Sequence, residues 1–576
     1  MNFIKNILSS FVAIWLVIVV FILLGLGVGV SVGSGMVKEV KSNSILEIDL
    51  SGDLKDYSPV EIDPLSELLN IKEQVTGFNN VCKAIDKATN DDNIKGISIK
   101  NIPANIGLAQ LTALRNILVK FQEKHKFIYA YNDSYTQKQY YLSSVANMIS
   151  IAPLGYVDLK GLHSEVMFYK DFQEKYGIKM EVIRHGKYKS AVEPFIANEM
   201  SDANRVQISE LIAGIWNEIS RELTTSRNID VDTAVEKMYG RSAVTSIKHG
   251  LVDLCLYPDE YEDYIKEKLA VQKLEKISMT DYMANISLSS LVEKTNQIAV
   301  IYAQGEIQYG EGSIDVIGQN KMISSLEKAA QDKNVSAIVL RVDSPGGSAL
   351  ASDLIWNAVE KAKKEKPVVV SMGNYAASGG YYISCGADRI FAEPTTITGS
   401  IGVFGIFPNG SGLAKKIGVN SEVVSTHENG AYYSAVLPLD SRYKVLVHQG
   451  IEMIYDEFLD RVSKGRNMSL EEVDRIAQGR VWTGAKAQEL GLVDEIGGLW
   501  EAICYAAKIA EVTEYSIKEL PKYEIDFGEM FDFNPFAKIQ IDGFLAEFKL
   551  QGLVNAKDFI KTKGVQARIP FELMID

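Results

Sequence analysis

Two short segments in different halves of the sequence contain the residues that could do covalent chemistry. Ser378 stands in Ala376-Ala377-Ser378-Gly379-Gly380, after an apolar run and among small residues. Lys189 stands in Tyr188-Lys189-Ser190-Ala191-Val192. A serine hydroxyl becomes a nucleophile when a neighbouring base takes its proton, and a lysine can be that base where burial lowers its pKa. The two residues are therefore a candidate nucleophile and a candidate general base for acyl transfer.

A third segment offers what such a reaction needs for its developing oxyanion. Asp343-Ser344-Pro345-Gly346-Gly347 follows an apolar, β-branched run and forces a turn whose amides can point outward together. By itself it is also an ordinary turn between a strand and a helix. Because neighbouring parallel strands present their loops at the same edge of a sheet, we expect this loop to lie beside Ser378.

Each candidate also has a purely structural interpretation. Serine is a preferred residue at helix N-termini, so Ser378 could be a helix cap. Lys189 could be a surface lysine that forms an ion pair with Glu193. His185, which precedes Lys189 in the same segment, is the alternative base.

The two halves of the sequence match one another in order and at a constant spacing. Gly177 matches Gly418, and the Gly-Leu-Val-Asp run that ends at Asp253 matches the run that ends at Asp494. Several matches in register are hard to obtain by chance. They indicate a duplication at the scale of a domain rather than a short-period repeat.

Each copy retains only half of the candidate chemistry. In the second copy the place of Lys189 is taken by Tyr433, and in the first copy the place of Ser378 is taken by Gln137. One composite site, with the base from one copy and the nucleophile from the other, accounts for both replacements.

The elements that must position these residues alternate between strand and helix. In the second copy we expect strands at 335–342 and 367–371, with helices at 348–364 and 378–386. Strands that alternate with helices indicate an α/β fold with a largely parallel sheet. The sequence therefore predicts two tandem α/β repeats.

The amino-terminal segment differs in kind from the rest of the chain. No charged residue occurs from 6 to 37, and 11–26 is almost continuously apolar. A membrane-spanning helix needs about 20 apolar residues, whereas the apolar part of a cleavable signal has roughly 7–15. We therefore expect a single uncleaved anchor with residues 7–32 in the bilayer. The few flanking charges barely decide its orientation.

Length and composition limit the other possibilities. A chain of 576 residues exceeds what one core usually supports. We expect an anchor at 1–40, a first repeat at 41–290, a second repeat at 291–520 and an extension at 521–576. A net charge of −14 argues against a nucleic-acid partner. The four cysteines and six histidines show no metal-ligand spacing, so we expect neither a metal nor a cofactor.

In combination, these segments resemble signal peptide peptidase A in its long, duplicated bacterial form, over nearly the whole chain. The resemblance implies a fold similar to the Clp protease proteolytic subunit and the crotonases, with two tandem repeats after an N-terminal transmembrane helix. It implies Ser378 as nucleophile and Lys189 as general base.

The resemblance also implies roles for three further residues. The amides of Gly379 and Gly347 would form the oxyanion hole. Ser400 lies in the matching segment Thr398-Gly399-Ser400 and would hydrogen-bond the amine of Lys189.

The implied enzyme is a membrane-anchored serine endopeptidase that degrades remnant signal peptides and other short apolar peptides. It would be a homotetrameric bowl on the bacterial cytoplasmic (inner) membrane, with its catalytic part on the periplasmic or outer side. Two other functions are considered, acyl-CoA chemistry on a crotonase-like fold and a non-catalytic membrane scaffold. The first needs an acidic general acid or base, which neither the Ser378 segment nor the Pro-Gly-Gly turn supplies.

Overall fold

The structure is a computed structural model, and it describes residues 38–50, 52, 54–58, 76–103, 105–289, 296–427, 430, 433–523 and 565–568. The predicted anchor at 7–32 lies outside these residues. Within the described part, none of the helices is both long enough and apolar enough to cross a membrane.

The first repeat is built on a six-stranded sheet in which all neighbours are parallel. In spatial order its strands are β8 (Leu254–Cys255), β6 (Met148–Ile151), β5 (Phe127–Asn132), β4 (Ile94–Ile99), β1 (Ser44–Ile48) and β9 (Lys276–Ser278). Helices α3 (Phe78–Thr89) and α4 (Leu108–Glu123) cover one face, and α11 (Pro258–Leu269) covers the other. Because both faces are covered, the central strands bury side chains on both sides of the sheet.

The second repeat has an eight-stranded sheet that is parallel except for one antiparallel pair at its edge. Its main path is β20 (Val481–Thr483), β18 (Ile397–Gly399), β16 (Val368–Ala377), β14 (Val335–Ser344), β10 (Gln297–Gln304) and β22 (Ser516–Leu520). Off this path, β17 (Arg389–Ala392) pairs with β16, and β21 (Glu495–Ile496) pairs with β17. Helices α13 (Gln319–Gln331) and α14 (Ala349–Lys363) cover one face, and α20 (Leu499–Ile509) covers the other. The predicted α/β alternation is confirmed.

Two elements of the second repeat differ from their predicted extents. The strand predicted at 367–371 continues as β16 to Ala377, because the chain stays extended after its apolar run ends. The helix predicted at 378–386 is a single turn, α15 (Gly379–Tyr382), after which the chain turns towards β17. Ser378 therefore lies directly between a strand and a helical turn.

A third sheet joins the two repeats. Its order is β12 (Gly312–Ser313), β13 (Val316–Gly318), β11 (Glu306–Gln308), β15 (Gly346–Ser348), β23 (Val565–Arg568), β19 (Val403–Asn409) and β7 (Lys179–His185). β7 of the first repeat pairs antiparallel with β19 of the second, from Val403 opposite His185 to Asn409 opposite Lys179. This pairing brings the segment that precedes Lys189 next to the segment that follows Ser400.

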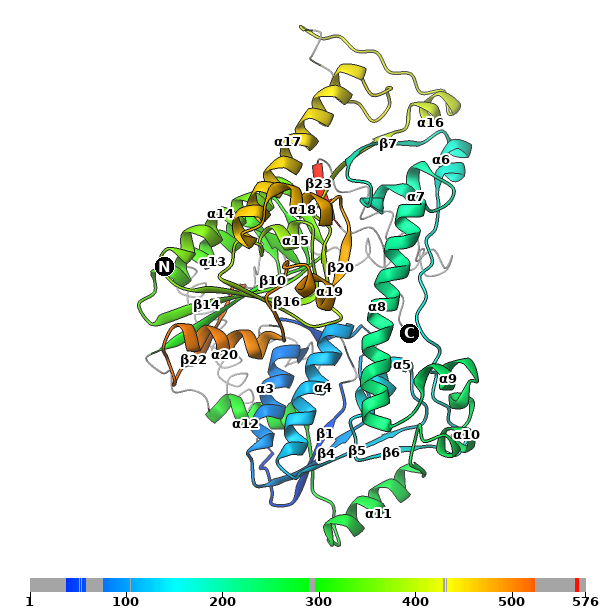
Figure 1. Cartoon of the computed structure of the whole chain (residues 1–576), viewed down its shortest axis with the longest axis vertical. Helices are drawn as coiled ribbons and strands as arrows, with labels where there is room; N and C mark the ends of the chain where they lie inside the picture. The colour runs from blue at the N-terminus through cyan, green and yellow to red at the C-terminus, as the bar shows by residue number, and fades with distance from the viewer. Residues whose placement is uncertain are drawn as a thin grey trace, which may run out of the picture.

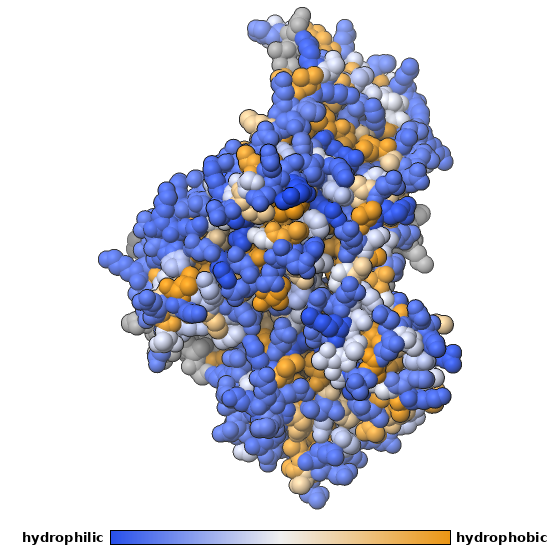
Figure 2. Space-filling view, viewed as in Figure 1, coloured by the Kyte–Doolittle hydropathy of each residue, from blue (hydrophilic) through white to orange (hydrophobic). Residues whose placement is uncertain are grey.

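Two helices of 26 residues occupy matching places in the repeats, α8 (Asp202–Arg227) and α17 (Ser441–Arg466). Figure 1 shows α8 as a long rod beside the sheets. It contacts β20 of the second repeat, where the side-chain oxygen of Gln207 accepts the N–H of Val481 at 3.0 Å. Polar residues cover most of the face seen in Figure 2, with apolar side chains in smaller patches.

Candidate active site

The structure brings Lys189 and Ser378 into direct contact. Nζ of Lys189 lies 2.8 Å from Oγ of Ser378, although the two residues come from different repeats. Both residues have no exposed surface. The same amine lies 3.0 Å from the hydroxyl and 3.0 Å from the carbonyl oxygen of Ser400. The three polar residues singled out from the sequence therefore meet at one buried point.

The surroundings of Lys189 favour its neutral form. Burial holds the pKa of its amine well below the usual range. The ring of Phe404 lies 5.9 Å from Nζ, on the apolar side of the site. A neutral amine has a lone pair, so at 2.8 Å it can accept the proton of the Ser378 hydroxyl.

Two residues were alternatives in the sequence, Glu193 as an ion-pair partner of Lys189 and His185 as the base, and both have other contacts. The carboxylate of Glu193 accepts hydrogen bonds from Ser201 and Asn204, at 2.7 and 3.0 Å, and does not pair with Lys189. Nδ1 of His185 lies 2.8 Å from the carboxylate of Glu452, and its ring stacks on Tyr455. Among the described residues, Lys189 is thus the only basic side chain in contact with Ser378.

The backbone of Ser378 is held in an unusual conformation. Its φ is +56° and its ψ is −114°, a region that residues with a Cβ rarely adopt. Its side chain does not cap the following turn, so the helix-cap interpretation is wrong. The N–H of Ser378 donates to the carbonyl oxygen of Gly399 at 2.8 Å, which ties it to β18. The strained turn directs the hydroxyl towards Lys189.

A turn of the second repeat, residues 478–480, holds the Lys189 loop. The N–H of Tyr188 donates to Gln478 O at 2.8 Å, and the N–H of Ser400 donates to Arg480 O at 2.6 Å. Gly479 has a φ of +78°, and a Cβ there would stand 2.6 Å from the Cβ of Lys189. No pattern in the sequence predicts the role of this turn. A helix that ends just before a Gln-Gly pair is its only local signal, and that signal does not point to Lys189.

The Pro-Gly-Gly turn lies beside the nucleophile, as expected from the order of the strands. Gly346 and Gly347 lie in β15, and a Cβ added to Gly379 would stand 3.2 Å from the amide nitrogen of Gly347. Gly347 has a φ of +153°, and a Cβ there would stand 2.1 Å from Ile307 O. Only glycine fits at this position, between the β11 backbone and the site.

The two strands that flank the site, β15 and β19, are bridged by β23, a segment from near the end of the sequence. β23 pairs antiparallel with β15, with Ala567 opposite Gly347, and also with β19, where Gln566 lies opposite Phe404. An extended segment therefore runs past the site, hydrogen-bonded on both sides. The sequence predicted an extension after 521 but gave it no place in the fold.

The matching positions in the other copies have different contacts. Gln137, in the place of Ser378, donates to Gly161 O and accepts the N–H of Gly161. Tyr433, in the place of Lys189, donates its hydroxyl proton to Pro408 O at 2.7 Å. Both side chains hold local loops, so the described residues contain one candidate dyad and not two.

Comparisons with known proteins agree with this arrangement. The model of peptidase family S49 matches two stretches, 120–272 and 360–513, which together make up more than half of the chain. The Clp protease family model matches residues 292–397. The two S49 stretches fall in the two repeats, which supports the duplication.

Three relatives match over most of the chain. Protease 4 of Haemophilus influenzae is 37% identical over 489 residues, which cover 81% of this chain and 79% of the relative. Protease 4 of Salmonella typhi is 34% identical over 543 residues, covering 90% and 86%. The chloroplastic serine protease SPPA of Arabidopsis thaliana is 30% identical over 548 residues, covering 92% and 78%.

Proposed function

Because the chain belongs to peptidase family S49 and is a serine protease of the signal peptide peptidase type, we propose that it hydrolyses peptides with a dyad of Ser378 and Lys189. The contact of 2.8 Å between the two buried side chains is the observation that carries this proposal. Acyl-CoA chemistry and a non-catalytic scaffold are set aside, since the family is one of serine proteases.

In the proposed reaction, neutral Lys189 accepts the hydroxyl proton as Oγ of Ser378 attacks the scissile carbonyl. The amides of Gly347 and Gly379 stabilise the oxyanion that forms. Protonated Lys189 then gives its proton to the leaving amine, and the C–N bond breaks to leave an acyl-enzyme. Water, deprotonated by the same lysine, releases the acid and restores Ser378. Ser400 orients the amine through the contact of 3.0 Å between the two side chains.

The substrates we propose are remnant signal peptides and other short apolar peptides. The apolar run at 11–26 supports a membrane anchor, which would hold the enzyme where such peptides are released. We place the catalytic part on the outer side of the bacterial cytoplasmic membrane, in a homotetramer. The first repeat, 41–290, would supply the base, and the second, 291–520, the nucleophile.

Replacement of Ser378 by alanine tests the proposal. Hydrolysis of an apolar signal peptide and labelling by a fluorophosphonate should both be lost, because the variant lacks only the attacking oxygen. Ser384→Ala is the matched control, since it removes another fully buried hydroxyl from the same region, one that donates to Gly380 O. Wild-type turnover by the Ser378→Ala enzyme would exclude Ser378 as nucleophile.

A further inference from the structure

The strand that leads to Ser378 contains a bulge. Along β14 and β16, Val342 pairs with Met372 and the next pair is Ser344 with Ala376. Three residues of β16, 373–375, therefore lie opposite a single residue of β14, which is Asp343. Bulges bend a strand and re-aim the side chains that follow it, and they are common next to active sites. This bulge ends three residues before Ser378.

The side chain of Asp343 holds the bulge in place. Its Oδ1 accepts the N–H of Tyr375 at 2.9 Å, which replaces a hydrogen bond that the sheet cannot make there. A Cβ at Gly373 would stand 2.9 Å from the Cβ and the Cγ of Asp343, so the two strands touch at this point. The carboxylate thus fixes both the spacing and the direction of β16.

Two other elements contact the same bulge. The side-chain oxygen of Asn374 accepts the N–H of Gln110, in the first turn of α4, at 3.3 Å. The hydroxyl of Thr396 donates to Gly373 O at 2.8 Å. The bulge is therefore held by β14, by the first repeat and by the segment that leads into β18.

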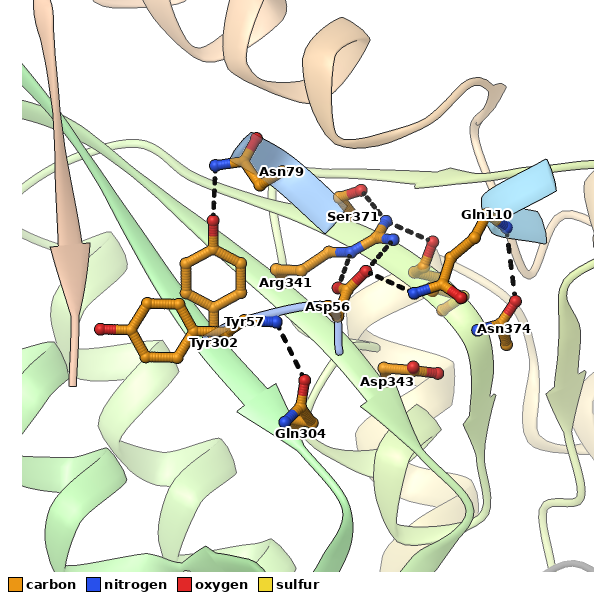
Figure 3. A network of polar contacts seen from close by, with 12 residues as sticks. Asp56, Tyr57, Asn79, Gln110, Tyr302, Gln304, Arg341, Asp343, Ser371 and Asn374 are labelled. Atoms are coloured by element: carbon orange, nitrogen blue, oxygen red, sulfur yellow. Dashed lines mark hydrogen bonds and ion pairs between the residues drawn. The ribbon is translucent and has the colours of Figure 1, made fainter. Parts of the chain in front are cut away.

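A buried ion pair between the repeats lies next to Asp343, as Figure 3 shows. Nε and Nη2 of Arg341 lie 2.6 and 3.1 Å from the carboxylate of Asp56, which comes from the first repeat. Nη1 of Arg341 also donates to Met372 O, at the start of the bulge, at 2.8 Å. Arg341 therefore links the first repeat to the strand that carries the nucleophile.

The charged groups that face Asp343 are Asp56, from the segment 54–58, and Arg341, from its own strand. The amide side chain of Asn374 faces it from β16. Glu393 and Cys82 lie further out, within electrostatic reach of Arg341. Burial, and then the charge of Asp56, raise the pKa of Asp343 to about 6, so its carboxylate is the main form only above that pH.

We propose that Asp343 is a positioning residue of the peptidase, which holds the 373–375 bulge and so fixes Ser378 relative to Gly347. Gly347 follows Asp343 in the next strand, β15, and Ser378 follows the bulge, so one side chain sets the distance between nucleophile and oxyanion hole. The inference rests on the proposed role of Ser378. The Pro-Gly-Gly turn alone would not require an acidic residue at its start.

Three variants test the role of the carboxylate. Asp343→Ala removes the acceptor of the Tyr375 N–H, and kcat should fall by roughly 10- to 100-fold, with KM changed less than about threefold, because the misplaced groups act in the transition state. Asp343→Asn keeps an acceptor oxygen but loses the charge of the carboxylate, so its kcat should fall by only about two- to fivefold at pH 8. Asp388→Ala is the matched control, since its Oδ2 accepts the N–H of Val368 at 2.8 Å at the other end of β16.

A pH series separates positioning from a merely structural role. The ratio of wild-type kcat to Asp343→Asn kcat cancels the ionisation of Lys189, which both enzymes share. This ratio should fall as the pH is lowered through about 6, because only the wild type loses its carboxylate. A ratio that is constant from about pH 5 to about pH 8 would overturn the proposal, and so would wild-type kcat in Asp343→Ala. Loss of activity in Ser378→Ala with normal activity in Asp343→Ala would reject the positioning role and retain the dyad.

Discussion

Gly479 approaches the main chain of Lys189 so closely that a Cβ at position 479 would stand 2.7 Å from the backbone nitrogen of the lysine. The two residues belong to different repeats. The approach of a glycine to a buried lysine is therefore one of the contacts that assemble the site.

Gly479→Ala should lower kcat by roughly 10- to 100-fold, because the new methyl must push the Lys189 loop away from Ser378. Gly418→Ala is the control. Gly418 has nearly the same φ, +77° against +78°, but a Cβ there meets none of the described atoms within 4 Å. The Gly418→Ala variant should lose about 1 kcal/mol of stability through backbone strain and should keep a normal kcat. Equal losses of kcat in the two variants would show that the contact with Lys189 is unimportant. Single-turnover acylation measures the effect.

Lys189→Arg should lose activity almost as completely as Lys189→Ala, by roughly a thousandfold or more. A guanidinium stays protonated and cannot accept the proton of Ser378, whereas burial lowers the pKa of the lysine amine. His185→Gln should keep near-normal rates, since His185 contacts Glu452 instead. Acylation by purified variants at several pH values tests this. Substantial activity in Lys189→Arg would remove the lysine from the mechanism and return His185 to consideration.

Asp56→Ala should destabilise the protein by about 3–5 kcal/mol, because it leaves the buried guanidinium of Arg341 without its partner. The side chains of Arg341 and Asp56 are only 3% and 2% exposed. Asp315→Ala breaks a second ion pair between the repeats, with Lys55, in which the carboxylate is 60% exposed. It should cost about 0–1 kcal/mol. Urea unfolding measures the free energy of unfolding of both variants. Similar losses of stability in the two would contradict the expectation that burial makes the first ion pair more important.

Glu393→Gln should stabilise the protein at alkaline pH and leave it unchanged in acid. Burial raises the pKa of Glu393 to about 8, and neither carboxyl oxygen has a hydrogen-bond partner among the described residues. A raised pKa means that the folded protein binds the proton of Glu393 more tightly than the unfolded chain does. The stabilisation of the fold that this gives is fully present below about pH 4.5 and is lost as the pH rises through 8. The wild type should lose up to about 1.4 kcal/mol per pH unit in this window. A parallel decline in Glu393→Gln would assign the loss to another group.

The duplication made the central pair predictable from the sequence. Lys189 and Ser378 each stand in a segment that the other copy has changed, and this pattern predicts a composite site. The α/β alternation followed from the spacing of apolar runs. The domain boundaries and the anchor stay predictions.

The contacts that hold the pair were not predictable in the same way. The turn at 478–480 and the ion pair of Asp56 with Arg341 join residues that are far apart in sequence, and their role depends on how one repeat docks on the other. The bulge at 373–375 lies just beyond the apolar run of β16, so no periodicity marks it. From the sequence, Asp343 is only the start of a turn.

The position of β23 beside Gly347 affects how the enzyme would bind its substrates. A peptide that binds along Gly347 must first displace residues 565–568, which already lie there. An occupant on the same chain competes as an intramolecular ligand, and its effective concentration does not fall when the protein is diluted. Residues 565–568 would therefore set a threshold of affinity. A peptide would be admitted only if it pairs with β15 and β19 better than this segment of the same chain does.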